Sequence, residues 1–121
     1  VVAIIVAILA AVAVPLMSAN RDRAMATEGA ALVGTTRTEA RIYRAENGSY
    51  TGMAAADLST TAAAPSGNKY FTSAPTLSNI GADTFTATAS GTGAASSIQV
   101  RINQDGLVEW STDSGSSWSN Y

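Results

Sequence analysis

The most informative stretch of this 121-residue chain for its fold is residues 1–19, VVAIIVAILAAVAVPLMSA. The stretch carries no charge, and its one polar side chain is that of Ser18. An α-helix of this length rises about 28 Å, close to the ~30 Å hydrocarbon core of a bilayer. The stretch therefore predicts a helix that is apolar all round and can span a membrane. A cleaved signal peptide is the alternative, but the residues after Ala19 continue the helix and do not begin a separate domain.

Residues 20–46 predict that the same helix continues with one apolar face. Apolar or small residues recur there at spacings of seven, four, four and three, which places them on one side of a helix. The helix is expected to end at Asn47-Gly48, because glycine tolerates the left-handed cap. A plain membrane anchor with a short stalk is the alternative, but it would leave this face without a partner. The predicted stripe consists of Met25, Leu32, Thr36, Ala40 and Tyr43, widened by Val33 and Ile42.

Residues 47–121 are expected to form a globular head that covers this stripe. After a loop with one helical turn over 54–58, strand-like segments lie at 70–73, 83–89, 97–103 and 107–112. Asp105-Gly106 predicts a tight hairpin between the last two segments. Trp118 and Tyr121 indicate that the polar tail folds back onto the head. The apolar side of the sheet is expected to contain Phe85, Ile98, Val100, Ile102 and Val108 or Trp110.

The predicted fold class is therefore α+β: a long N-terminal α-helix packed on a small antiparallel sheet of three to four strands. Its parts are the hydrophobic half of the helix at 1–19, the amphipathic half at 20–46 and the head at 47–121.

Composition excludes several functional classes. The chain has no cysteine and no histidine, so it lacks the usual zinc ligands, thiol nucleophiles and the commonest general base. A net charge of −2, with no run of basic residues, gives no evident nucleic-acid site. We predict a protein that is not an enzyme and needs no cofactor. The acids Glu28 and Glu39 are expected on the solvated face of the helix or in ion pairs between subunits.

The N-terminal stretch VVAIIVAILAAVAVP resembles the first helix of type IV pilins and of type II secretion pseudopilins. Pro15 falls on the family proline, and YRAENGSYTGMAAADL resembles the region where the long helix ends in many members. The family's N-methylated aromatic residue and nearby glutamate have no counterpart in the printed sequence, so their roles are not carried over. The family's small and aliphatic positions match Ile8, Leu9, Ala10, Ala11 and Ala13, and Ala7 stands where many members have glycine.

The resemblance implies a structural subunit of an extracellular, helical type IV pilus-like filament that serves adhesion, motility or DNA uptake. Its expected partners are further copies of itself, the inner membrane before assembly, and the pilus assembly machinery. A pseudopilin of a type II secretion system and a membrane-anchored binding module that does not polymerise are the alternatives. Small residues allow helices to approach closely. The predicted filament interface comprises Val2, Ala3, Ile5, Val6, Ile8, Leu9, Ala10, Val12, Ala13, Pro15 and Leu16.

Pro15 is expected to distort this helix. Proline removes one backbone hydrogen bond and crowds the preceding turn. In a filament, neighbouring subunits and water can satisfy the freed groups, so we predict a kink or a locally unwound segment within residues 6–16.

The sequence offers two further candidate sites. Asp105, Glu109 and Asp113 invite comparison with the calcium site of major pseudopilins, but the hairpin explains Asp105 and Glu109 falls within a strand, so no metal is predicted. Asn47-Gly48-Ser49 matches the glycosylation sequon, which makes Asn47 a candidate glycosylation site.

Overall fold

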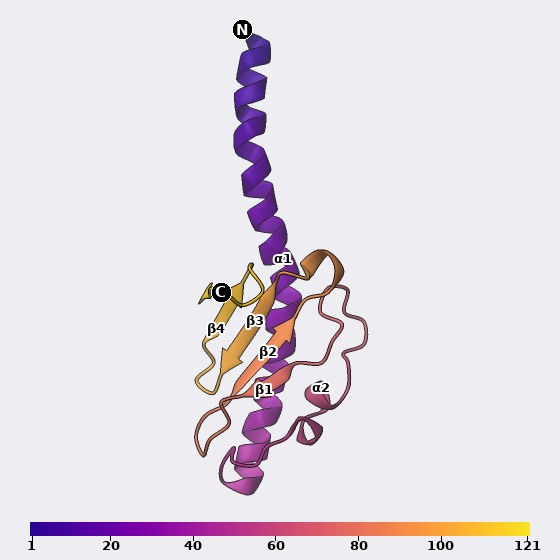
Figure 1. Cartoon of the computed structure of the whole chain (residues 1–121), viewed down its shortest axis with the longest axis vertical. Coiled ribbons are helices and arrows are strands. Elements are labelled where there is room, and N and C mark those ends of the chain that lie inside the picture. The colour runs from indigo at the N-terminus through magenta and orange to yellow at the C-terminus, as the bar shows by residue number, and fades with distance from the viewer.

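The computed structural model describes residues 1–11 and 18–121, and over them it shows a long helix lying along a five-stranded antiparallel sheet (Figure 1). The strands follow one another in the sheet in chain order, from β1 to β5. The predicted α+β class is confirmed. The elements are α1 (Val2–Asn47), α2 (Ser59–Ala62), β1 (Thr76–Ser78), β2 (Thr86–Ser90), β3 (Gln99–Asn103), β4 (Val108–Ser111) and β5 (Ser119–Asn120), with short 3-10 turns at Ala55–Asp57 and Gly93–Ala95.

The C-terminal end of α1 lies where the sequence predicts it. Gly48 has a φ of 82°, the left-handed conformation that glycine adopts without strain, and its N–H donates to the carbonyl of Arg44 at 2.7 Å. Residues 12–17, which include Pro15 and the second part of the segment 6–16 where a kink is predicted, lie outside the described residues.

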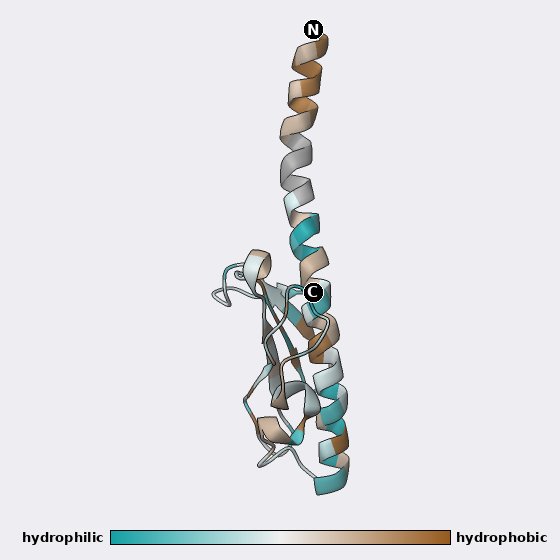
Figure 2. Cartoon of the chain, turned by 90° about the vertical axis from the view of Figure 1, so that its right-hand side faces the viewer, coloured by the Kyte–Doolittle hydropathy of each residue, from teal (hydrophilic) through white to brown (hydrophobic). Residues whose placement is uncertain are grey.

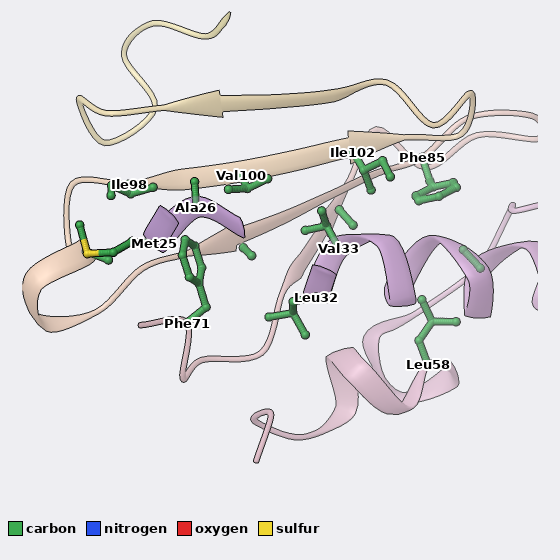
Figure 3. Packing of buried hydrophobic residues seen from close by; sticks show 14 of the residues in the cluster. Met25, Ala26, Leu32, Val33, Leu58, Phe71, Phe85, Ile98, Val100 and Ile102 are labelled. Atoms are coloured by element: carbon green, nitrogen blue, oxygen red, sulfur yellow. The ribbon is translucent and has the colours of Figure 1, made fainter. Parts of the chain in front are cut away.

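The core lies between α1 and the apolar side of the sheet, where α1 contacts β2 and β3 (Figure 3). On the helix, the predicted stripe is confirmed at Met25, Leu32, Val33, Thr36 and Ala40, all of which are buried. On the sheet, Phe85, Ile98, Val100 and Ile102 are buried, while Val108 and Trp110 are partly buried against the same cluster.

Ile42 does not belong to this stripe. Its side chain is 55% exposed, so the prediction that it widens the buried face is wrong. Ile42 follows the buried Ala40 by two residues, which is about 200° around the helix and therefore on the opposite side. Tyr43, one residue further on, is half-buried and packs against the core.

The strands differ from expectation at the two edges of the sheet. The predicted hairpin over 97–112 is confirmed, with β3 and β4 paired from Gln99↔Ser111 to Ile102↔Val108. The predicted strand at 70–73 is absent from the described chain, because the carboxylate of Glu28 accepts the N–H groups of Tyr70 and Phe71 at 2.8 and 2.9 Å, which removes them from any ladder. The edge strands β1 and β5 were not predicted, and they raise the strand count from three or four to five.

The close approach of the head to α1 gives a stability prediction at Gly29. A Cβ at this position would lie 2.7 Å from Cε2 and 2.8 Å from Cζ of the buried Phe71 ring. We expect Gly29→Ala to lower the free energy of unfolding by about 1–3 kcal/mol, because the ring must shift in a filled core. In a helix interior without such a clash, alanine in place of glycine would raise the free energy of unfolding by up to about 1 kcal/mol, so the expected effect at Gly29 has the opposite sign.

Gly34→Ala is the matched control, since a Cβ there meets nothing within 4 Å. It should raise the free energy of unfolding by about 0.5–1 kcal/mol. Chemical denaturation of the full chain in detergent, followed by circular dichroism, measures both values. Two changes of the same sign would contradict the packing described at Gly29.

The tail folds back as predicted. The Tyr121 N–H donates to the carbonyl of Val108 at 3.0 Å, and its hydroxyl lies 2.8 Å from Oγ1 of Thr27 on α1. The guanidinium carbon of Arg23 lies 4.8 Å from the centre of the Tyr121 ring, within the range of a cation–π contact. The C-terminal residue therefore fastens the last strand to the helix.

The carboxylate of Asp113 holds the turn between β4 and β5. The Ser111 hydroxyl donates to it at 2.6 Å, and the hydroxyl and N–H of Ser117 donate at 2.5 and 2.9 Å. The bond from Ser111, followed by those from Ser117, lowers the pKa of Asp113 from 3.8 to about 2.

This turn is expected to weaken in acid. Because the pKa of Asp113 is lower in the folded chain than in the unfolded chain, its contribution is complete above about pH 4 and is lost as the pH falls toward 2. Asp113→Asn removes the titration, so the urea midpoint of the wild type should fall more steeply over this pH range than that of the variant. Parallel curves for the two proteins would show that Asp113 does not couple to folding.

Candidate assembly surface

The first eleven residues of the chain form an apolar surface that the head does not cover. Their seven largest side chains are between 54% and 96% exposed, and the remaining residues are alanines. Figure 2 shows this part of α1 extending away from the head, in the brown of hydrophobic residues. The exposed side chains are those of Val1, Val2, Ile4, Ile5, Val6, Ile8 and Leu9.

Burial of this surface against an apolar partner is favourable. Each large aliphatic side chain gains about 1.5–3 kcal/mol when it is buried. The side chains point to all sides of the helix, so one neighbouring helix cannot cover them all.

No helix in the described part of the chain is both long and apolar enough to cross a membrane. Residues 12–17, which belong to the predicted span at 1–19, lie outside that part.

A second uncharged surface follows α1 along the head. Its residues are exposed and recur at spacings of seven, four, three, four and three, so they share one helix face turned away from the sheet. The hydroxyls of Thr35 and Thr38 donate to the carbonyls of Ala31 and Gly34, at 3.1 and 3.2 Å. This face, which we call the outer helix face, therefore presents methyl groups rather than free hydroxyls. It consists of Ala24, Ala31, Thr35, Thr38, Ile42 and Ala45.

Glu28 and Glu39 of α1 have partners within the chain, which corrects their predicted place on a solvated face or between subunits. Glu39 accepts bonds from the Ser59 hydroxyl at 2.7 Å and from the Thr60 N–H at 3.1 Å, and so holds α2 against α1. Burial would raise the pKa of Glu28, but hydrogen bonds from the backbone of Phe71, Tyr70 and Lys69, helped by the charge of Lys69, lower it below its ordinary value. Both acids are half-buried and fasten the head to its own helix.

The predicted interface residues are only partly described. Val2, Ala3, Ile5, Val6, Ile8, Leu9 and Ala10 are all exposed on α1. Val12, Ala13, Pro15 and Leu16 lie outside the described residues. The outer helix face was not predicted from the sequence, although the spacing of the small residues opposite the buried stripe indicates it.

The candidate glycosylation and metal sites are separate from this surface. Asn47 is the last residue of α1, and its side-chain amide donates to the carbonyl of Tyr43 at 2.9 Å, so its glycosylation remains a prediction. All three acids of the candidate metal site have hydrogen-bond partners within the chain. Glu109 accepts a bond from Arg101 at 3.1 Å, Asp113 accepts one from the Ser111 hydroxyl at 2.6 Å, and Asp105 accepts one from the side-chain amide of Gln104 at 3.3 Å. Among the described residues, no three such side chains gather as metal ligands.

Comparison with known proteins supports the fold. No family model and no curated protein matches the chain. Among solved structures, it is similar to the non-core minor pilin PilV of Neisseria meningitidis, with a TM-score of 0.57, covering 84% of this chain and 90% of that one at 19% sequence identity. At this identity the likeness concerns the fold alone. The chain therefore has a type IV pilin-like fold, as the resemblance of its first residues predicts.

Proposed function

We propose that this chain is the structural subunit of an extracellular type IV pilus-like filament and that it assembles through the N-terminal half of α1. The observation that carries the proposal is the exposed, uncharged and uniformly apolar surface of residues 1–11 on a helix whose other half is fixed to a folded head. A lone anchor also needs an apolar helix, but it does not need the pilin-like head that accompanies it here.

In this proposal residues 1–19 lie first in the inner membrane and then among the same helices of neighbouring subunits. Residues 20–46 carry the outer helix face, whose side chains, except that of Ile42, are small and allow neighbouring helices to approach. Residues 47–121 form the outer shell. The contact joins different surfaces of successive copies and does not close on itself, which is the geometry of a fibre.

Isolation of filaments tests the proposal. Cells that produce the chain together with a pilus assembly machinery are sheared, and the shed filaments are collected and analysed by mass spectrometry. We expect this chain to be the bulk component of the filaments. Recovery of the chain only in the membrane fraction would favour the non-polymerising module, and recovery only from short envelope structures of a secretion system would favour the pseudopilin.

A further inference from the structure

The side of the sheet that faces away from α1 carries a polar cavity, which we call the sheet-face cavity. We propose that it binds one unit of an uncharged saccharide. Apart from Ile102, the side chains of its lining belong neither to the apolar surface of residues 1–11 nor to the core. The cavity is lined by Asn79, Thr86, Arg101, Asn103 and Glu109, together with Ile102, whose side chain belongs to the core.

The register of the sheet brings the lining together. Thr86 of β2 lies opposite Asn103 of β3, and Arg101 of β3 lies opposite Glu109 of β4. Their neighbours along each strand point into the core, so these four side chains share the outer face. Asn79 follows β1 directly and closes the cavity from the side, with its amide nitrogen 3.4 Å from Oγ1 of Thr86.

The loop that carries Asn79 is braced. Asn79 has a φ of 52°, a left-handed conformation that asparagine tolerates better than most residues. Its carbonyl accepts the Thr84 hydroxyl at 2.9 Å, and the Gly81 N–H donates to the carbonyl of Thr84 at 3.0 Å. The amide of Asn79 is therefore presented at the edge of the cavity by a fixed backbone.

Arg101 and Glu109 form an ion pair in the cavity, so their charges cancel and their side chains are held in place. Nε of Arg101 donates to Oε1 of Glu109 at 3.1 Å, with the two side chains 34% and 26% exposed. The guanidinium carbon of Arg101 also lies 4.0 Å from the centre of the Trp118 ring. Stacking on one side and the ion pair on the other hold the guanidinium plane in one orientation.

The lining retains hydrogen-bonding capacity for a ligand. Oδ1 of Asn103 accepts the N–H groups of Asp105 and Leu107 at 3.0 and 3.1 Å. The amide nitrogen of Asn103 therefore remains as the donor that this side chain offers to a ligand. Within the described residues, the terminal nitrogens of Arg101 and Oε2 of Glu109 make no hydrogen bond. The cavity thus offers donors and acceptors side by side in planar groups.

This set of groups selects a neutral, hydroxyl-rich ligand. An anion attracted by Arg101 would be repelled by the carboxylate of Glu109, and a cation attracted by Glu109 would be repelled by the guanidinium of Arg101. An apolar molecule would find no apolar wall, since the one aliphatic residue of the lining is only 5% exposed. Adjacent hydroxyls of a sugar both donate and accept, so they can pair with an amide, a guanidinium and a carboxylate at once.

The test uses the full chain, labelled with ¹⁵N, in a detergent without a sugar headgroup. Methyl glycosides of glucose, galactose and N-acetylglucosamine are titrated in turn, with sialic acid and inorganic phosphate as charged probes. We expect at least one neutral glycoside to shift the backbone amide signals of residues 79, 86, 101, 103 and 109, with a dissociation constant of about 1–10 mM.

Three variants locate the site. Asn79→Gly keeps the positive φ and removes the amide, and Glu109→Gln keeps the shape and removes the charge; each should weaken binding at least about fivefold. Ser90→Ala, on the same outer face at the far end of β2, should bind as the wild type does. The proposal is overturned if no neutral glycoside shifts these signals, if only sialic acid or phosphate does, or if Asn79→Gly and Ser90→Ala behave alike. Because the experiment uses the unassembled chain, its outcome is independent of whether filaments form.

Discussion

Ala10→Arg is expected to abolish filaments while leaving the head folded. Ala10 is exposed on the apolar half of α1, where the proposed assembly places it against the helices of neighbouring subunits. Alanine allows close approach, whereas arginine brings a long side chain and a charge among the uncharged residues 1–11 of neighbouring subunits. An unpaired charge removed from water costs several kcal/mol, and every subunit of the filament would carry that cost.

Two readouts separate assembly from folding. The yield of sheared filaments should fall below detection, and the thermal midpoint of the detergent-solubilised chain should stay unchanged, because Ala10 has no contact with the head. Ser90→Arg adds the same side chain to the solvent side of the sheet and should leave the filament yield near that of the wild type. Normal filaments from Ala10→Arg would refute the role assigned to residues 1–11.

Phe71→Ala is expected to destabilise the head strongly. The Phe71 side chain is fully buried, and its ring lies directly against Gly29 of α1. Removal of a buried aromatic ring costs about 3–5 kcal/mol, a large share of the ~5–15 kcal/mol that stabilises a small domain. The thermal midpoint should fall by more than about 10 °C.

Ile42→Ala provides the comparison for Phe71→Ala. Ile42 is also a large apolar residue, but it lies on the exposed side of α1, so its truncation should change the free energy of unfolding by no more than about 0.5 kcal/mol. Thermal melts of both variants in the same detergent measure the difference. Similar losses from the two substitutions would contradict the position of the core.

Local patterns predicted the centre of the fold. The alternation of Ile98, Val100 and Ile102 and the turn at Asp105-Gly106 identify the β3–β4 hairpin, because a one-residue shift would expose the whole apolar side. The helical stripe, likewise, follows from residue spacing. The edges of the sheet could not be predicted in this way, since β1 and β5 contain three and two residues and have no alternation long enough to detect.

Local sequence patterns also could not predict the contacts that charged residues make with segments far away in the sequence. Glu28 lies 42 positions before Tyr70, whose N–H it binds, and no periodicity links two such segments. The sheet-face cavity likewise depends on register, which places Arg101 opposite Glu109 only once the hairpin is folded. The apolar surface of residues 1–11, in contrast, is evident from composition, but the identity of its partner requires an experiment on the assembly.

A cryo-EM reconstruction of filaments assembled from this chain would show directly whether residues 1–11 form the contacts between subunits. We expect residues 1–11 of neighbouring subunits to contact one another at the centre of the filament, the outer helix face to lie near them, and the outer face of the sheet to point to solvent. Filaments held together through the heads alone, with residues 1–11 outside the subunit contacts, would contradict the account.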